Sequence, residues 1–278
     1  MYNFNGLEIS RRLIVSSAFE YGWGYGFSVN PWMWFCMKTG LVRIDYFGAF
    51  ITSTITIDEI IPKNGYGIRI YPDKVLNKKG WANCGIIKFE EKLKKLKGKI
   101  KKCIVSVGSL NSIQEILFLV GRLNRYDIAG IEFNISCHNV KLDFLENENV
   151  LRNLCKEVRI LTSKSLILKI NYEADYVSLS QIAQEEGFNL IHAINTLKFN
   201  SKSLGDCAVS SFRNKSKALK VIRELRKGGI TIPIIGGSGI WTMEDIEDYQ
   251  SAGANVFSIS HQLIYFPPWA SVLATRLK

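Results

Sequence analysis

The 278-residue sequence contains no apolar run of the roughly 20 residues that a membrane-spanning helix needs. Its first residues include Glu8, Arg11 and Arg12, and no apolar segment follows a basic start as it does in a secretory signal peptide. No low-complexity linker, internal repeat or abrupt change of composition divides the chain. The sequence therefore predicts a soluble, cytoplasmic protein with a single domain over residues 1–278.

The cysteines form no CxxC pair and show no metal-ligand spacing. They lie at positions 36, 84, 103, 137, 155 and 207. Such a scatter is typical of reduced thiols, most of them buried as small apolar side chains, and it argues against a structural zinc site. One cysteine can still be chemically active, and its neighbours in the sequence must decide which.

Acidic residues are outnumbered by basic ones, 25 against 36, and much of the excess lies in residues 88–102, where eight of 15 residues are lysine. This run has two interpretations, a solvated helix and loop or an electrostatic footprint for nucleic acid, a membrane surface or an acidic partner. Hardly any aromatic residue interleaves with the lysines, as binding of single strands would favour. The solvated helix is the preferred interpretation.

Eight short apolar, β-branched runs recur along the chain. They cover residues 13–17, 49–54, 103–107, 130–136, 166–170, 190–195, 232–235 and 255–260. Near-continuous apolar runs of this length are typical of strands that are buried on both faces. Patterns with helical spacing lie between many of them, at residues 113–123, 147–161, 177–186, 218–225 and 242–251.

Eight strands that alternate with helices predict a (β/α)8 TIM barrel, with an open doubly wound sheet as the alternative. Thr242 is a suitable N-cap for the last of these helices. The segment around residues 55–85 has little periodicity and several turn residues. A loop of that length in a compact domain is usually functional, so we predict a lid over the active site.

Polar residues end most of the predicted strands, where a barrel carries its active site. They are Ser16, Ser17, Ser53, Ser106, Asn134 with Cys137 and Asn139, Lys169, Asn195, Thr196, Gly236, Gly237, Ser238, Gly239, Ser260 and His261. Amides that both donate and accept hydrogen bonds suit a planar heterocycle with alternating carbonyl and N–H groups. The set contains neither the paired carboxylates of a glycosidase nor the His/Asp cluster of a metal hydrolase.

The glycines of Gly236-Gly237-Ser238-Gly239 directly follow an apolar strand. Because glycine lets backbone N–H groups approach an anion, this turn is a candidate phosphate cradle. A tight strand-to-helix turn would use the same residues. The position after the seventh strand favours the phosphate interpretation.

The fourth strand and the residues after it read Glu132-Phe133-Asn134-Ile135-Ser136-Cys137-His138-Asn139-Val140-Lys141. This segment resembles the dihydroorotate dehydrogenases, whose motif reads Glu-Leu-Asn-Ile-Ser-Cys-Pro-Asn-Val-Lys. Further similar segments are Leu168-Lys169, Ile194-Asn195-Thr196-Leu197 and Pro233-Ile234-Ile235-Gly236, and residues 77–85 are similar to the family's substrate loop. The resemblance extends from Gly6 to about Pro268 and is closest to the soluble, cysteine-based class.

The resemblance implies an FMN-dependent oxidation of dihydroorotate or a related dihydropyrimidine. Cys137 matches the family's catalytic base, and a free thiol titrates near pH about 8.5, close enough to neutral for proton exchange. Asn77, Asn134, Asn139, Asn195 and Thr196 match the substrate-binding positions. The implied FMN-binding set is Ser17, Ser53, Ser106, Lys169, Gly236, Gly237, Ser238, Gly239, Ser260 and His261.

Several positions depart from the family pattern. Ser53 replaces the lysine of strand two, Ser106 replaces the asparagine of strand three, and Ser260-His261 replaces a Gly-Thr pair. Residues 207–211 align with a Gly-Gly-Leu-Ser-Gly phosphate loop but contain no glycine. The side chains at 207–211 add Cβ atoms where the family has glycines, which would shift FMN, weaken its binding or have no effect. Because Ser53 replaces the strand-two lysine, a substrate carboxylate would need another cation.

Two further hypotheses remain open beside the leading one. A tRNA-dihydrouridine synthase is also an FMN barrel and would suit the basic charge, but strand six lacks that family's His-Gly-Arg signature. A non-catalytic barrel that has lost FMN would explain the missing glycines. For the leading hypothesis, the resemblance implies a small pyrimidine-like substrate, an electron-transfer partner protein or a small acceptor, and a homodimer; it implies neither membrane nor nucleic-acid binding.

Overall fold

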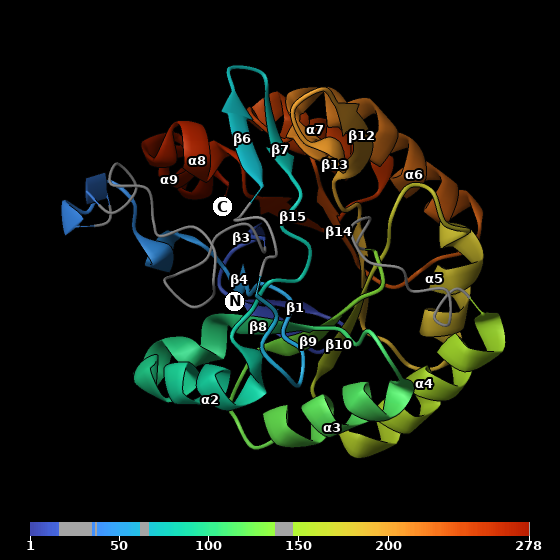
Figure 1. Ribbon diagram of the computed structural model, residues 1–278. Coiled ribbons are helices and arrows are strands. Elements are labelled where there is room, and N and C mark those ends of the chain that lie inside the picture. Colours follow the sequence, from blue (N-terminus) through green and yellow to red (C-terminus); the bar gives the residue numbers. More distant parts are fainter. Residues whose placement is uncertain (17–34, 37, 62–66, 137–146, 278) are drawn as a thin grey trace.

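The computed structural model describes residues 1–16, 35–36, 38–61, 67–136 and 147–277. Eight parallel strands close into a barrel at its centre (Figure 1), in the order β10-β11-β14-β15-β3-β4-β8-β9. They are β3 (Leu13–Val15), β4 (Phe50–Ile51), β8 (Cys103–Val107), β9 (Gly130–Asn134), β10 (Ser165–Lys169), β11 (Leu190–Ala193), β14 (Ile234–Gly237) and β15 (Val256–Ile259). Each overlaps one of the eight predicted runs, so the TIM-barrel prediction is confirmed and the open sheet is excluded.

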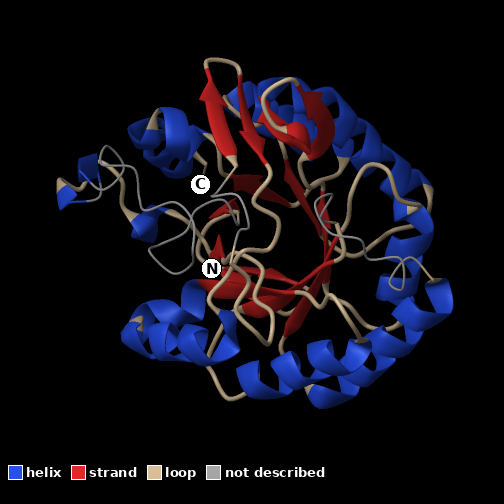
Figure 2. Ribbon diagram, in the orientation of Figure 1, coloured by secondary structure: helices blue, strands red, loops and turns tan. Residues whose placement is uncertain are grey.

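Helices surround the barrel (Figure 2). They are α2 (Gly85–Lys95), α3 (Ile113–Leu123), α4 (Glu148–Leu161), α5 (Tyr176–Glu185), α6 (Lys215–Lys227), α7 (Met243–Ala252), α8 (Gln262–Tyr265) and α9 (Pro267–Arg276). Thr242 caps α7 as predicted, in a reciprocal capping box with Asp245. Among the described residues, no helix combines the length and apolar character that crossing a membrane requires.

The lysine-rich run forms α2 and a short 3-10 helix, Lys97–Lys102. Phe89 and Leu93 turn inward to the core, while Lys88, Lys94 and Lys95 are exposed. This arrangement is the solvated amphipathic helix that the sequence favoured.

The inside of the barrel is apolar at one end and polar at the other. β1 (Tyr2–Phe4) and β2 (Leu7–Ile9) form an N-terminal hairpin, and the Leu7 and Ile9 side chains of β2 are buried in the apolar layer. The barrel residues of this layer are Ile14, Ala49, Ile51, Ile104, Ile167, Leu190, Ile235 and Val256. Two positions further along several of these strands come Ser16, Ser53, Ser106, Lys169, His192, Gly237 and Ser258. Since alternate residues of a strand share a face, these side chains continue the interior toward the carboxyl end.

A second, antiparallel sheet stands at the carboxyl end of the barrel. It contains β6 (Ile68–Tyr71), β7 (Lys74–Asn77), β12 (Leu197–Ser201) and β13 (Gly205–Ser211), in the order β12-β13-β7-β6. The predicted irregular loop at 55–85 thus includes a hairpin whose turn is Pro72-Asp73. Residues 207–211, aligned above with a phosphate loop, belong to strand β13. The lid function of 55–85 stays a prediction.

Candidate active site

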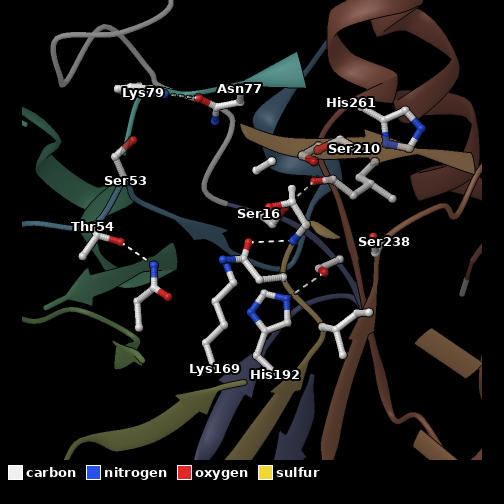
Figure 3. Close-up of a pocket in the computed structure, with 18 of the residues that line it drawn as sticks. Ser16, Ser53, Thr54, Asn77, Lys79, Lys169, His192, Ser210, Ser238 and His261 are labelled. Atoms are coloured by element: carbon white, nitrogen blue, oxygen red, sulfur yellow. Dashed lines mark hydrogen bonds between the residues drawn. The ribbon is translucent and has the colours of Figure 1, made fainter. Parts of the chain in front are cut away.

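A pocket opens at the carboxyl end of the barrel, between the barrel strands and the second sheet (Figure 3). It encloses about 1170 Å³, including space open to solvent. Its lining residues are Ser16, Ser53, Thr54, Ile68, Asn77, Lys79, Gly80, Trp81, Ala82, Asn134, Lys169, His192, Ile194, Asn195, Thr196, Ala208, Ser210, Ser238, Gly239, Ser258, Ile259, Ser260, His261 and Gln262. Two lysines and no carboxylate occur among them, and buried Glu132 lies 3.9 Å from the ammonium of Lys169 behind this lining, so the described wall favours a strongly polar ligand.

Most of the predicted site residues meet in this pocket. Those that line it are Ser53, Asn77, Asn134, Lys169, Asn195, Thr196, Ser238, Gly239, Ser260 and His261. Ser106, Gly236 and Gly237 are buried next to it but do not line it. Ser17, Cys137 and Asn139 lie outside the described residues, and their predicted roles remain predictions.

The asparagine side chains are held in place by the protein itself. Asn134 donates to Thr54 Oγ1 (2.7 Å) and accepts from the Ser136 hydroxyl (2.7 Å). Asn195 donates to the carbonyl of Ser136 (3.0 Å). The Asn134 oxygen also accepts from Ser136 N (3.1 Å) and the Asn195 oxygen accepts from Thr196 N (2.9 Å). Among the described contacts this leaves one N–H on Asn134, and one N–H and one lone pair on Asn195, for further hydrogen bonds from a fixed position. Preorganised amides of this kind suit a planar heterocycle.

The loop after β7 is fixed by Asn83, which is completely buried. Its amide donates to Thr56 Oγ1 (2.8 Å) and to the Trp81 carbonyl (2.7 Å), and its oxygen accepts from Gly85 N (2.8 Å). Asn77 instead lies at the pocket and accepts from Lys79 N (2.7 Å). The two asparagines of the motif therefore have different roles. Asn83 holds the loop in shape, and Asn77 lines the cavity.

Four polar side chains meet at the pocket floor inside the barrel. His192 Nδ1 lies 2.6 Å from Glu132 Oε2, and His192 Nε2 lies 2.9 Å from Ser258 Oγ. Lys169 Nζ lies 3.9 Å from the other oxygen of Glu132. All four residues are at least 95% buried. These groups come from β9, β10, β11 and β15, so they join much of the barrel through charge and hydrogen bonds.

The charges of this floor are determined by burial and by pairing. Burial alone would raise the pKa of Glu132, but Lys169 and His192 lower it to about 2. Burial lowers the pKa of His192, and Lys169 adds to that effect while Glu132 opposes it. Glu132 is therefore an anion at neutral pH, and His192 is neutral.

The β14 turn uses its glycines for close packing. A Cβ atom on Gly236 would lie 2.6 Å from the Tyr249 ring, and one on Gly239 would lie 2.8 Å from Lys215 N. Ser238 and Gly239 both have positive φ, +79° and +94°. The turn thereby contacts the start of α6, where Asn214 donates to Ser238 Oγ (3.2 Å). Only Ser238 and Gly239 of this turn line the described pocket.

His261 lies at the end of β15 with its ring stacked on Trp241, the ring centroids 5.6 Å apart. Burial lowers the pKa of His261 to about 4, so the ring is neutral at pH 7. His261 can therefore offer a hydrogen bond to a ligand, but it brings no positive charge.

Sequence reasoning missed His192, Ser258 and Lys79 as lining residues. The signal for His192 and Ser258 was present, because each lies two positions after a buried apolar residue on a barrel strand and so shares its inward face. Lys79 falls within the substrate-loop motif at a variable position, so the motif drew no attention to it.

Comparisons with known proteins agree with this geometry. A family model described as dihydroorotate dehydrogenase matches residues 37–275. The chain belongs to the dihydroorotate dehydrogenase family. This membership favours the leading hypothesis over a tRNA-dihydrouridine synthase.

Curated relatives in this family share modest sequence identity with the chain over most of its length. The catalytic subunits of dihydroorotate dehydrogenase B (NAD(+)) from Petrotoga mobilis and Thermoanaerobacter pseudethanolicus are 28% and 27% identical, each over 91% of this chain and 84% of the relative. The crystal structure of a ligand-free dihydroorotate dehydrogenase from Eimeria tenella has a TM-score of 0.76 at 19% identity, covering 99% of this chain and 85% of that one. That structural likeness supports the fold.

Proposed function

We propose that this protein is an FMN-dependent oxidoreductase that oxidises dihydroorotate or a related dihydropyrimidine. The observation that carries the proposal is the meeting of Asn77, Asn134, Asn195 and Lys169 in one pocket at the carboxyl end of the barrel. Family membership over residues 37–275 supports the same reaction class.

In this proposal the three amides bind the substrate ring. A dihydropyrimidine presents alternating carbonyl and N–H groups, which carboxamides can match as donors and acceptors. The hydrogen bonds of Asn134 and Asn195 to Thr54 and Ser136 orient these amides before the substrate arrives. Thr196 would add a hydroxyl beside them.

Cys137 is the proposed base, on the strength of the motif that contains it. It follows Ser136, the residue that contacts both Asn134 and Asn195, by one position. A thiolate can take the proton that the substrate loses next to the reacting carbon, and a thiol pKa near about 8.5 leaves this exchange accessible at neutral pH.

The residues present fit FMN by their chemistry. Lys169 is a buried cation that would stabilise the negative charge gained by the flavin ring on reduction. Ser210, Ser238, Ser260 and the backbone of Gly239 offer hydrogen-bond donors where β13, β14 and β15 reach the pocket. When bound, FMN supplies the acceptor for the hydride that leaves the substrate ring. These donors would bind the phosphate through hydrogen bonds.

An electron-transfer partner is part of the proposal. The relatives from Petrotoga mobilis and Thermoanaerobacter pseudethanolicus are named as catalytic subunits of an NAD(+)-dependent enzyme. By analogy, we expect a second protein to take electrons from this chain, and the family resemblance favours a homodimer of the chain itself.

The proposal is tested by flavin uptake followed by substrate reduction. The purified protein is incubated with FMN, desalted and examined for flavin absorbance, and dihydroorotate is then added without oxygen. We expect a yellow protein whose flavin bleaches, with bleaching slowed by about 100-fold or more in Cys137→Ser. Cys207→Ser, outside the described pocket lining, is the control and should bleach normally.

Three other outcomes are informative. Protein that takes up no FMN would overturn the proposal and favour the non-catalytic barrel. Flavin that binds but is bleached only by another dihydropyrimidine would correct the substrate. Bleaching that is unchanged in Cys137→Ser would remove the cysteine as the base.

A further inference from the structure

The hydrogen-bonded chain Glu132–His192–Ser258 ends at the pocket. Its two contacts are 2.6 Å and 2.9 Å long, and both His192 and Ser258 line the cavity. Figure 3 shows the contact between His192 and the neighbouring hydroxyl at the floor. Gly237, opposite Ser258 in the β14–β15 register, leaves the space that Ser258 Oγ occupies.

The direction of each hydrogen bond in the chain is set by its buried end. Ionised Glu132 can only accept, so His192 Nδ1 must carry the proton. A neutral imidazole then presents a lone pair on Nε2, so the Ser258 hydroxyl must donate to it. With its one hydrogen committed, Ser258 Oγ has only lone pairs left to offer elsewhere.

Lys169 strengthens this ordering. Its ammonium lies 3.9 Å from Glu132 Oε1 and provides the positive charge that balances the carboxylate. A second proton on His192 would place another cation in the same buried space. The network therefore contains one anion, one cation and a neutral imidazole, so its charges balance.

We propose that Ser258 is a dedicated hydrogen-bond acceptor at the pocket floor for an O–H or N–H group of the bound ligand, with His192 and Glu132 as positioning residues. The inference deepens the proposed function and rests on it for the ligand. FMN offers hydroxyls on its ribityl chain and one N–H on its oxidised ring, and a dihydropyrimidine offers ring N–H groups.

The ordering is tested first without any ligand, by nitrogen NMR of isotope-labelled histidine in the full-length protein. The chain has three histidines, and His192→Gln identifies the signals of His192 by their loss. At about pH 7 we expect a neutral ring with its proton on Nδ1. Ser258→Ala should shift the Nε2 signal, and Ser180→Ala, which removes another buried serine hydroxyl outside the pocket lining, should not. A doubly protonated ring, or a proton on Nε2, overturns the inference.

Ligand titrations then locate the donor. FMN, lumiflavin (the same ring without the ribityl phosphate chain) and dihydroorotate are titrated into wild type, Ser258→Ala and Ser180→Ala. Loss of the acceptor should weaken one ligand about 3- to 10-fold. A defect with FMN but not lumiflavin assigns the ribityl hydroxyls, a defect with both assigns the ring N–H, and a defect confined to dihydroorotate assigns the substrate.

Equal affinity of Ser258→Ala and wild type for every probe overturns the acceptor role. If wild type binds none of the probes, the proposed function and the ligand part of this inference fail together. The NMR result still decides the ordering of the network in that case, so the two failures can be told apart.

Discussion

Gly237 and Ser258 face each other across the β14–β15 pair, and the Ser258 hydroxyl occupies the space that a side chain on Gly237 would need. A Cβ atom built on Gly237 would approach Ser258 Oγ far inside the 3.0 Å that real Cβ contacts respect. This glycine was predicted as part of a phosphate cradle. In the structure it makes room for the floor of the pocket.

Gly237→Ala should therefore displace Ser258 and destabilise the protein by about 1–3 kcal/mol, the usual cost of overpacking a core. The free energy of unfolding measured in denaturant checks this. Gly121→Ala is the matched control, because that glycine is exposed within α3 with no atom near the new methyl. It should stabilise the protein by up to about 1 kcal/mol. Equal stability of the two variants would contradict the close packing at Gly237.

Glu132→Gln should change how stability depends on pH. The pKa of Glu132 is about 2 in the folded protein against an ordinary value of 4.5, so its ionised form stabilises the fold above pH 4.5 and this contribution is lost as the pH falls toward 2. Glu132→Gln has no carboxyl to protonate at this position, so its stability should not fall between pH 4.5 and pH 2 from this cause. At neutral pH it should be less stable by about 3–5 kcal/mol, because Lys169 is left buried without its carboxylate.

Unfolding free energies of wild type and Glu132→Gln, measured from acid to neutral pH, test this difference. Glu59→Gln is the control, since Glu59 pairs with the exposed Lys88 and such a pair is worth at most about 1 kcal/mol. Parallel pH profiles for wild type and Glu132→Gln would show that Glu132 does not have a lowered pKa in the folded protein.

Asn77 and Asn83 should separate binding from stability within one loop. Asn83→Ala breaks several buried hydrogen bonds and should destabilise the protein by about 2–4 kcal/mol. Asn77→Ala should leave the melting temperature close to that of wild type but weaken substrate binding about 10-fold or more. Thermal unfolding and the KM for dihydroorotate measure the two effects, and a reversed pattern would mean that Asn77 has a structural role.

We expect Lys79 to bind the carboxylate of a substrate that carries one. It and Lys169 are the lysines of the described lining, and Ser53 stands where the family has its strand-two lysine. Lys79→Gln should weaken dihydroorotate about 10-fold, in the range of a charge-assisted hydrogen bond, while leaving uncharged dihydrouracil unaffected. If both ligands lose affinity equally, Lys79 shapes the loop and does not bind the carboxylate.

The barrel could be predicted from sequence because every strand is buried on both faces and so leaves an apolar run. The hairpin β6–β7 could not, since its strands pair with each other and β7 also pairs with the distant β13. Two of the four β7 residues are buried and none of β6 is, so neither strand leaves a buried apolar run. Pro72-Asp73 between two short β-prone runs was its one local sign.

The pocket wall was predicted where motifs carry it, as at Asn134 and Asn195, and Lys169 was predicted at the floor in the same way. The other three residues of the floor were not predicted, because Glu132, His192 and Ser258 come from strands far apart in the chain and become partners only when the barrel closes. A buried charge makes sense only beside its counter-ion, and the sequence does not show that neighbour.

The closure of the barrel has a consequence for how the chain folds. β3 pairs with β15, so Ile14 lies opposite Ser258, and Arg12 donates to the carbonyl of Asn255 (2.8 Å). The ring is joined by contacts between residues more than 240 positions apart. During synthesis β3 cannot pair with β15 until β15 has been made, so the barrel cannot close and the pocket floor cannot form before then. The hydrogen-bonded chain of Glu132, His192 and Ser258 can therefore form only after the last barrel strand has been made.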